Sequence, residues 1–231
     1  MKKAVLPLIV LTSVLASCGQ SSNQDLPTAQ ASNQLYSGAP FRTIDEAMKS
    51  DKPIIVITDT GILKNNAFIK QENEAPKAED TSKSPNLQAQ ALCNYPGYGC
   101  TVSTQWTYKG NIKGNRTLYT TVLNNTDFDS PINITASKSN GSTISGGIDY
   151  QAIKVSIGWN NSSTLTTQVT GTAKKRATTY VYTWEVGTGG YGTQYSYPNT
   201  FTSCYQAKTE CISSNFSAAN YTGLGYELSY Y

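Results

Sequence analysis

The side chains able to carry acid–base chemistry in this sequence are carboxylates, because the chain contains no histidine. This composition excludes Ser-His-Asp and Cys-His catalysis and histidine-based metal sites. The carboxylates of the C-terminal region are Asp127, Asp129, Asp149, Glu185, Glu210 and Glu227. A glycosidase needs two such groups facing each other across a sugar, but none of these residues lies in a distinctive motif. We therefore expect no enzymatic activity, no catalytic residue and no cofactor.

Oxygen ligands also gather in the stretch NNTDFDS, where Asn124, Asn125, Asp127 and Asp129 could surround a calcium ion. The stretch lacks the glycine and the closing glutamate of an EF-hand loop. A turn capped by Asx side chains is the favoured interpretation, and we expect no metal site.

Besides Cys18, the chain has the cysteines Cys93, Cys100, Cys204 and Cys211, which form two Cys-x6-Cys stretches. An even number of cysteines in an exported chain indicates disulfides. We predict local pairing within each stretch, while crossed pairing would instead clip the two ends of one domain together. Zinc binding by the thiolates is a further alternative, but its usual spacing is two residues.

The N-terminus has the features of a cleaved export signal. Lys2 and Lys3 give it a positive start. The apolar run from Ala4 to Ala16 is shorter than the roughly 20 residues that a membrane-spanning helix needs. These features predict that the chain leaves the cytoplasm.

The residues Leu15, Ala16, Ser17 and Cys18 resemble the lipobox of bacterial lipoproteins. That resemblance implies a signal peptide of residues 1–17 and a lipid on Cys18 as the mature N-terminus. The alternative is an ordinary signal peptide with a chance cysteine. The expected location is extracytoplasmic, with the chain lipid-anchored to the cell membrane or the outer membrane.

The charge balance bears on the partners of the mature chain. The sequence has 18 basic and 15 acidic side chains, and Lys2 and Lys3 belong to the expected signal peptide. The mature chain is therefore nearly neutral, which gives no electrostatic case for nucleic acid. The expected partner is the membrane, through the N-terminal lipid, and a glycan or another envelope component is a candidate ligand.

Residues 18–92 are expected to form a lipid-anchored tether and linker. Residues 19–35 are small and polar without apolar periodicity, as is typical of a tether. Residues 64–90 mix Lys, Glu, Ser and Pro and predict a second linker or a long loop.

Between these polar stretches, a short helix and a strand are expected at 43–59. Thr43 and Glu46 have the spacing of a capping box, which predicts a helix start. The run PIIVITD (Pro53 to Asp59) is compact and β-branched, which predicts a strand. We expect this segment to add an edge to the main domain.

Residues 93–231 predict an all-β domain, namely an antiparallel β-sandwich. Thr, Ser, Gly, Tyr and β-branched residues dominate, in short alternating runs without helical periodicity. The expected strands cover 101–109, 116–124, 131–138, 143–158, 164–170, 178–187, 193–197 and 224–230.

The stretch PINITASKSNGSTISGGIDY predicts a hairpin that turns at Asn140-Gly141. Its apolar positions are Ile132, Ile134, Ala136, Ile144, Ile148 and Tyr150. A slip of one residue inverts every side chain, so we predict one extra residue that pairs Ile134 with Ile148 and Ile132 with Tyr150. A further bulge or bend is expected near Ala152.

Farther along, Tyr180, Tyr182, Trp184 and Val186 alternate in TYVYTWEVG. Such a stripe is more typical of a core than of a sugar-stacking face, and both interpretations stay open. The glycine- and tyrosine-rich stretch 187–199 is expected to be a loop that could contact a ligand.

Two functions fit these features. The first is a surface-displayed β-sandwich that serves as a binding or structural module of the cell envelope. The second rests on residues 131–171, whose Ser/Thr-rich alternation resembles the stem of aerolysin-type β-pore-forming toxins. That resemblance implies an amphipathic hairpin that leaves a sheet and enters a membrane. Burial of Ile132, Ile134, Ile148 and Tyr150 against aromatic neighbours would favour the first function.

Overall fold

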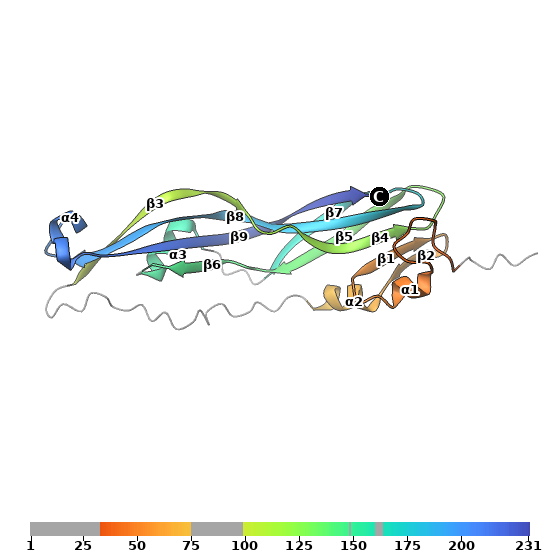
Figure 1. The fold of residues 1–231 in the computed structure, drawn as a ribbon, viewed down its shortest axis with the longest axis horizontal. Coiled ribbons are helices and arrows are strands. Elements are labelled where there is room, and N and C mark those ends of the chain that lie inside the picture. The colour runs from red at the N-terminus through yellow and green to blue at the C-terminus, as the bar shows by residue number, and fades with distance from the viewer. Residues whose placement is uncertain (1–32, 75–98, 148, 160–163) are drawn as a thin grey trace, which may run out of the picture. The chain divides into compact units, whose positions relative to one another are not determined.

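β-Structure dominates the part of the chain that the structure describes (Figure 1). The computed structural model describes residues 33–74, 99–147, 149–159 and 164–231. The strands are β1 (Ile54–Thr58), β2 (Gly61–Lys64), β3 (Cys100–Lys113), β4 (Thr117–Asn124), β5 (Ser130–Ser139), β6 (Thr143–Gly146), β7 (Thr164–Ala173), β8 (Ala177–Pro198) and β9 (Ile212–Tyr230). The helices are α1 (Ile44–Met48), α2 (Asn66–Asn73), α3 (Tyr150–Ile157), α4 (Cys204–Ala207) and the 3-10 turn η2 (Lys208–Glu210).

Two long strands form the centre of a seven-stranded sheet, whose order is β2-β1-β4-β8-β9-β6 with β3 also paired to β8. β8 has 22 residues, so it has room for two neighbours on the same side. β4 pairs with its first part, ending with Asn124 opposite Ala177, and β3 pairs with its second part, from Lys113 opposite Val186 to Cys100 opposite Pro198. Figure 1 shows β3, β8 and β9 running side by side.

The sheet is mixed rather than purely antiparallel, which corrects the predicted sheet type. β1 runs parallel to β4, with Ile54 opposite Thr121 and Val56 opposite Leu123, whereas the other pairs of the sheet are antiparallel. A second sheet consists of β5 and β7. The expected sandwich stays a prediction.

The helix-strand segment extends the edge of the main sheet, as its sequence predicted. Thr43 caps α1 by accepting a hydrogen bond from the backbone N–H of Glu46 at 3.2 Å. A buried cluster of Ala47, Ile54, Val56 and Leu123 joins α1 to β1 and β4. Burial of these apolar side chains therefore fixes the segment to the sheet.

The predicted linker at 64–90 is wrong at its start, because residues 66–73 form α2. Asn65 caps this helix by accepting a hydrogen bond from the backbone N–H of Phe68 at 2.9 Å. The same Asn65 oxygen accepts from Ile54 N–H at 3.0 Å, and its amide donates to the Lys52 carbonyl at 2.7 Å. Phe68 is fully buried. The capping asparagine and Phe68 are the sequence signals that identify this helix.

The predicted loop at 187–199 is also wrong, because β8 continues through it to Pro198. Its glycines let neighbouring backbones come close, since a Cβ on Gly190 would collide with the carbonyl oxygen of Tyr108 on β3. Composition alone predicted a loop here, because it does not reveal that the glycines lie in a strand whose neighbour comes very close.

The expected strand at 143–158 is replaced by β6 followed by α3. Asp149 caps α3 by accepting hydrogen bonds from the backbone N–H groups of Gln151 and Ala152. Gly158 ends the helix with a φ of 66°. This helix, which begins at Tyr150, places Ile153 and Ile157 on one buried face, and the bend predicted near Ala152 is therefore wrong.

Candidate functional site

β5 and β7 form a separate two-stranded ribbon, which we call the β5–β7 ribbon. They pair over their whole lengths, from Ser130 opposite Ala173 to Ser139 opposite Thr164. Among the residues that the structure describes, neither strand pairs with a strand of the main sheet. The ribbon is therefore attached to the sheet by side chains rather than by strand pairing.

This pairing corrects the predicted hairpin. Ile134 lies opposite Val169 of β7, and Ile132 lies opposite Gly171, not opposite Tyr150. Ile148 lies outside the described residues. The sequence prediction failed because β7 supplies a partner of equal length farther along the chain, while Tyr150 begins a helix.

The β5–β7 ribbon has one apolar and one polar face. The apolar face carries Ile132, Ile134, Ala136, Leu165, Val169 and Ala173, all of them buried. The opposite face carries Asn133, Thr135, Ser137, Thr166, Gln168 and Thr170, which are exposed or half-buried hydroxyl and amide side chains. Lys138 is the only charged residue within the two strands.

The apolar face of the ribbon packs on the main sheet. Ile134 and Val169 share one buried cluster with Val122 of β4 and Val181 of β8. Tyr226 of β9 packs against this cluster, and its O–H donates to the carbonyl oxygen of Thr170 at 3.3 Å. The alternation seen in the sequence thus corresponds to a buried inner face and a solvent-facing outer face.

The stretch considered for calcium forms the turn that leads from β4 into the ribbon. The Asn124 amide donates to the carbonyl oxygens of Phe128 at 2.9 Å and Ala173 at 3.0 Å. Its oxygen accepts from Thr126 N–H at 3.1 Å, which is an Asx turn. Asn124 therefore ties the start of β5 to the end of β7.

Two ion pairs join this turn to the turn between β7 and β8. Asp129 accepts a hydrogen bond from Lys174 at 2.8 Å, and Asp127 accepts one from Arg176 at 2.9 Å. The basic residues Lys174, Lys175 and Arg176 form the turn that joins β7 to β8. Both aspartate carboxylates are therefore paired with basic side chains of the same chain.

The same contacts shift the ionisation of these groups. The hydrogen bond from Arg176 lowers the pKa of Asp127, and the hydrogen bond from Lys174 lowers the pKa of Asp129. A carboxyl with a lowered pKa stabilises the fold at pH values above the ordinary carboxyl pKa. This stabilisation is lost as the pH falls through the lowered pKa. Because both groups are fully exposed, solvent and salt screen these pairs.

Beyond the ribbon, α3 packs on the other part of the main sheet. Ile153 and Ile157 share a cluster with Phe216 and Ala218 of β9. Trp106 of β3 donates a hydrogen bond from its indole N–H to Ser156 at 2.8 Å. Between β5 and β7, α3 is therefore fixed to the main sheet by a small, separate core, and β6 is fixed to it by pairing with β9.

The carboxylates that could have served acid–base catalysis are dispersed over the fold. Asp149 caps α3, Glu185 pairs with Lys138 on the ribbon, and Glu227 pairs with Arg116 at 3.0 Å. Glu210 lies in η2. Each of the first three, like Asp127 and Asp129, is engaged in a structural contact. The structure brings no two of these carboxylates together in a described contact.

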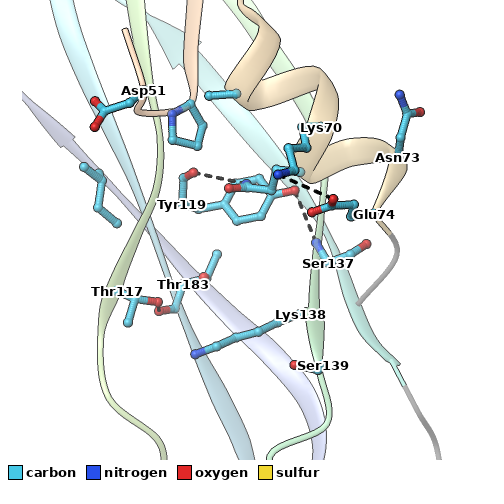
Figure 2. Close-up of a pocket in the computed structure, with 14 residues that line it drawn as sticks. Asp51, Lys70, Asn73, Glu74, Thr117, Tyr119, Ser137, Lys138, Ser139 and Thr183 are labelled. Carbon is cyan, nitrogen blue, oxygen red and sulfur yellow. Dashed lines mark hydrogen bonds and ion pairs between the residues drawn. The ribbon is translucent and has the colours of Figure 1, made fainter. Parts of the chain in front are cut away.

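A groove with a volume of about 990 Å3 lies between α2, β4 and the end of β5 (Figure 2). Lys70 and Gln71 of α2, Tyr119 of β4, and Ser137 and Lys138 of β5 contribute to its lining. Gln71 donates to the carbonyl oxygen of Tyr119 at 3.2 Å. A groove of this size could hold a small organic ligand. It was missed from the sequence because α2 was taken for a linker.

The aromatic stripe of β8 lies on the surface of the sheet, with Tyr180, Tyr182 and Trp184 half-buried. The Arg116 guanidinium lies 3.5 Å from the ring centroid of Tyr182, and the Lys113 ammonium lies 5.6 Å from that of Trp184. Because cations cover these rings, the stripe presents less free ring surface to a sugar than its sequence indicated.

One of the predicted disulfides is present. Cys204 and Cys211 are bonded, with a Cα–Cα distance of 5.1 Å. This bond excludes the crossed connectivities and a zinc site made of all four cysteines. Cys93 and the lipidation candidate Cys18 lie outside the described residues, so their roles stay predictions.

Comparisons of this chain with protein-family models, with curated proteins and with solved structures give no match. No helix within the described residues is long and apolar enough to cross a membrane.

Proposed function

We propose that this protein permeabilises membranes by releasing the β5–β7 ribbon from the main sheet and inserting it into a bilayer. The observation that carries the proposal is the ribbon itself, a two-stranded unit with one apolar and one uncharged polar face that packs on the sheet without strand pairing. A membrane-inserted strand pair needs this division, with lipid on one side and water on the other.

The connections of the ribbon support a simple route to insertion. Asn124 of β4 lies opposite Ala177 of β8, and Ser130 of β5 lies opposite Ala173 of β7. The turns between these pairs, residues 125–129 and 174–176, differ in length by two residues. An even difference keeps alternate side chains in phase across the joint. Straightening both turns would join β4 to β5 and β7 to β8 as one continuous hairpin.

In the folded-back arrangement the apolar faces of the two halves cover each other. Val122 and Val181 of the sheet and Ile134 and Val169 of the ribbon belong to the same cluster. After straightening they would lie on one side of one hairpin, where water would solvate them poorly. Lipid would cover that side, so the bilayer supplies the driving force for the change.

The dimensions of the ribbon also fit a bilayer. β5 and β7 each have ten residues, and a strand that crosses the hydrocarbon core needs about 9–11. Lys138 lies at the end of β5, where a lipid-facing lysine costs about 0–1 kcal/mol rather than the larger penalty at the membrane centre. Several copies would close a pore, because each inserted ribbon leaves two strand edges to be paired.

The buried state of Ile132 and Ile134 against Tyr119 and Tyr226 is what the sequence analysis connected with a static binding module. The same burial is required of an insertion hairpin before it meets lipid. What favours insertion is that β5 and β7 pair with no strand of the main sheet within the described residues, so that the four-residue pairing of β6 with β9 is the strand pairing that would have to open.

The expected lipid at Cys18 fits this activity as a proposal about location. An anchored, extracytoplasmic chain would stay close to a bilayer, and a polar tether would set its reach. The expected tether of 19–35 is wrong at its end, because Gln34 bridges to Thr43 and Leu35 packs against the cluster of α1 and β1, while residues 19–32 lie outside the described residues. The aerolysin-type resemblance of residues 131–171 supports the proposal for β5 and β7 alone, because β6 and α3 lie between them.

A second candidate is a cell-envelope binding module, and the groove beside α2 supports it. The groove is large enough for part of a glycan or another small ligand, and hydroxyl, amide, ammonium and carboxylate groups line it together with apolar side chains. In that case the ribbon would be a fixed wall of the groove.

Dye release from lipid vesicles tests the first function against the second. We would add the full chain carrying Cys18→Ser, which removes the expected lipid, to sealed vesicles of phosphatidylcholine with or without phosphatidylglycerol. The proposal predicts release that depends on protein concentration. Vesicles that stay sealed in all compositions would contradict it and would favour the binding module.

A further inference from the structure

The ion pair between Lys138 and Glu185 joins the ribbon to the centre of the main sheet. The Lys138 ammonium lies 2.7 Å from a Glu185 carboxylate oxygen, and the two side chains are 30% and 11% exposed. Glu185 lies on β8 opposite Leu224 of β9, beyond the part of β8 that pairs with β4. Figure 2 shows the Lys138 side chain extending from β5 toward the side of the groove where Thr117 and Thr183 lie.

Two turns enclose the Glu185 carboxylate. A Cβ on Gly114, between β3 and β4, would collide with one carboxylate oxygen, and a Cβ on Gly141, after β5, would lie 3.7 Å from the other. The Gly114 N–H also donates to the Glu185 carbonyl oxygen at 2.8 Å. The glycines thus leave a fitted space for a charged side chain in the middle of the sheet.

The Glu185 carboxylate acts on two neighbouring side chains, Tyr221 and Lys138. Burial, and then the Glu185 charge, raise the pKa of Tyr221 on β9. Lys138 is the cation that pairs with Glu185 among the described contacts. Removing one member of a buried pair leaves the other charge uncompensated, which costs far more than the intact pair contributes.

This contact can exist only while the ribbon is folded back. Lys138 lies near the end of β5 that is farthest from the joint at residues 125–129. Straightening the joint would carry Lys138 away from β8. A contact made in one of two states shifts the equilibrium toward that state.

We propose that the Lys138–Glu185 ion pair is an autoinhibitory latch that keeps the ribbon on the sheet until one of the two charges is lost or drawn away. This inference rests on the proposed function for its biological meaning, but the latch itself is a property of the folded chain. Its loss would loosen β5 and β7 on the sheet, and full release would then require β6, which follows β5, to separate from β9.

The test compares Glu185→Gln, which keeps the shape and removes the charge, with Glu227→Gln as a matched control. Glu227 also pairs with a cation at 3.0 Å, but both of those side chains are nearly half exposed. Hydrogen exchange of the β5 and β7 amides is measured on the full chain in solution, together with dye release from phosphatidylglycerol-containing vesicles.

The latch predicts that Glu185→Gln speeds amide exchange in β5 and β7 about tenfold or more. Breaking a fully buried ion pair would have a larger effect, but solvent reaches Lys138 and reduces the penalty for leaving its charge unpaired. The amides of β4 and β8 should exchange as in the parent chain, and the control should leave both regions unchanged. The double variant Lys138→Met/Glu185→Gln should exchange more slowly than Glu185→Gln alone, because it leaves no orphaned charge.

Parent-like exchange of the ribbon in Glu185→Gln would overturn the latch, as would a uniform rise over the whole sheet. Should that variant fail to fold, Lys138→Met alone gives the same comparison. Faster exchange of the ribbon without any dye release would support the latch and contradict the pore. Dye release with unchanged exchange would contradict the latch and support the pore.

Discussion

A disulfide between the ribbon and β9 is expected to abolish dye release, and its reduction should restore it. The positions are Gly171→Cys on β7 and Leu228→Cys on β9. A Cβ on Gly171 would lie 3.7 Å from Cγ of Leu228, close enough for a disulfide after a small side-chain adjustment. The cross-link should hold the ribbon on the sheet, so no part of it could reach the bilayer.

The control is a cross-link within the ribbon, Asn133→Cys with Thr170→Cys, since these residues lie opposite each other. It leaves the ribbon free to move as a unit, and release should persist. The parent chain under the same reducing conditions accounts for opening of Cys204–Cys211. Undiminished release from the oxidised Gly171→Cys/Leu228→Cys chain would show that the ribbon need not leave the sheet.

Leu123→Ala is expected to destabilise the whole main sheet by about 2–5 kcal/mol, which is the usual range for a large-to-small change in a core. Leu123 is fully buried in β4, between α1 and the parallel partner β1. Its loss should weaken the N-terminal segment and the central strands in one transition, because β1 and β4 are paired. Chemical denaturation followed by tryptophan fluorescence and by far-UV circular dichroism measures this.

Leu118→Ala on the same strand is the matched control, since that side chain is 43% exposed. It should change the free energy of unfolding by about 0.5 kcal/mol or less. Two separate transitions for Leu123→Ala would contradict the description of the N-terminal segment as an integral edge of the sheet.

Local patterns predicted the elements whose side chains alternate regularly. The strand at β5 was anticipated within one residue at each end, because Ile132 and Ile134 alternate with polar residues. The capping pair Thr43 and Glu46 located α1. In these places the local preference and the final environment agree.

Pairing between distant segments could not be read in the same way. Two later apolar segments could pair with the strand that contains Ile134, and the sequence favoured the nearer one. The structure pairs it with Val169, because Asp149 and Gly158 close the intervening residues into a helix. Both capping residues are visible in the sequence, so this error had a detectable signal.

No sequence feature indicated that the ribbon would fold back onto the main sheet. This fold-back depends on Asn124 meeting Ala173 and on Asp129 meeting Lys174, contacts between residues more than forty positions apart. The buried position of Glu185 likewise depends on where Gly114 and Gly141 pass it. Charge and composition alone placed none of these side chains near one another.

The most direct test of membrane insertion is the environment of neighbouring β5 side chains after permeabilisation. An environment-sensitive fluorophore would be attached at Ile134→Cys or at Thr135→Cys, each in the full chain with Cys18→Ser. The account predicts that a lipid-soluble quencher reaches the label at 134 and that a water-soluble quencher reaches the label at 135. If both labels keep the emission and quenching that they show in solution, the ribbon does not enter the bilayer and the central claim is wrong.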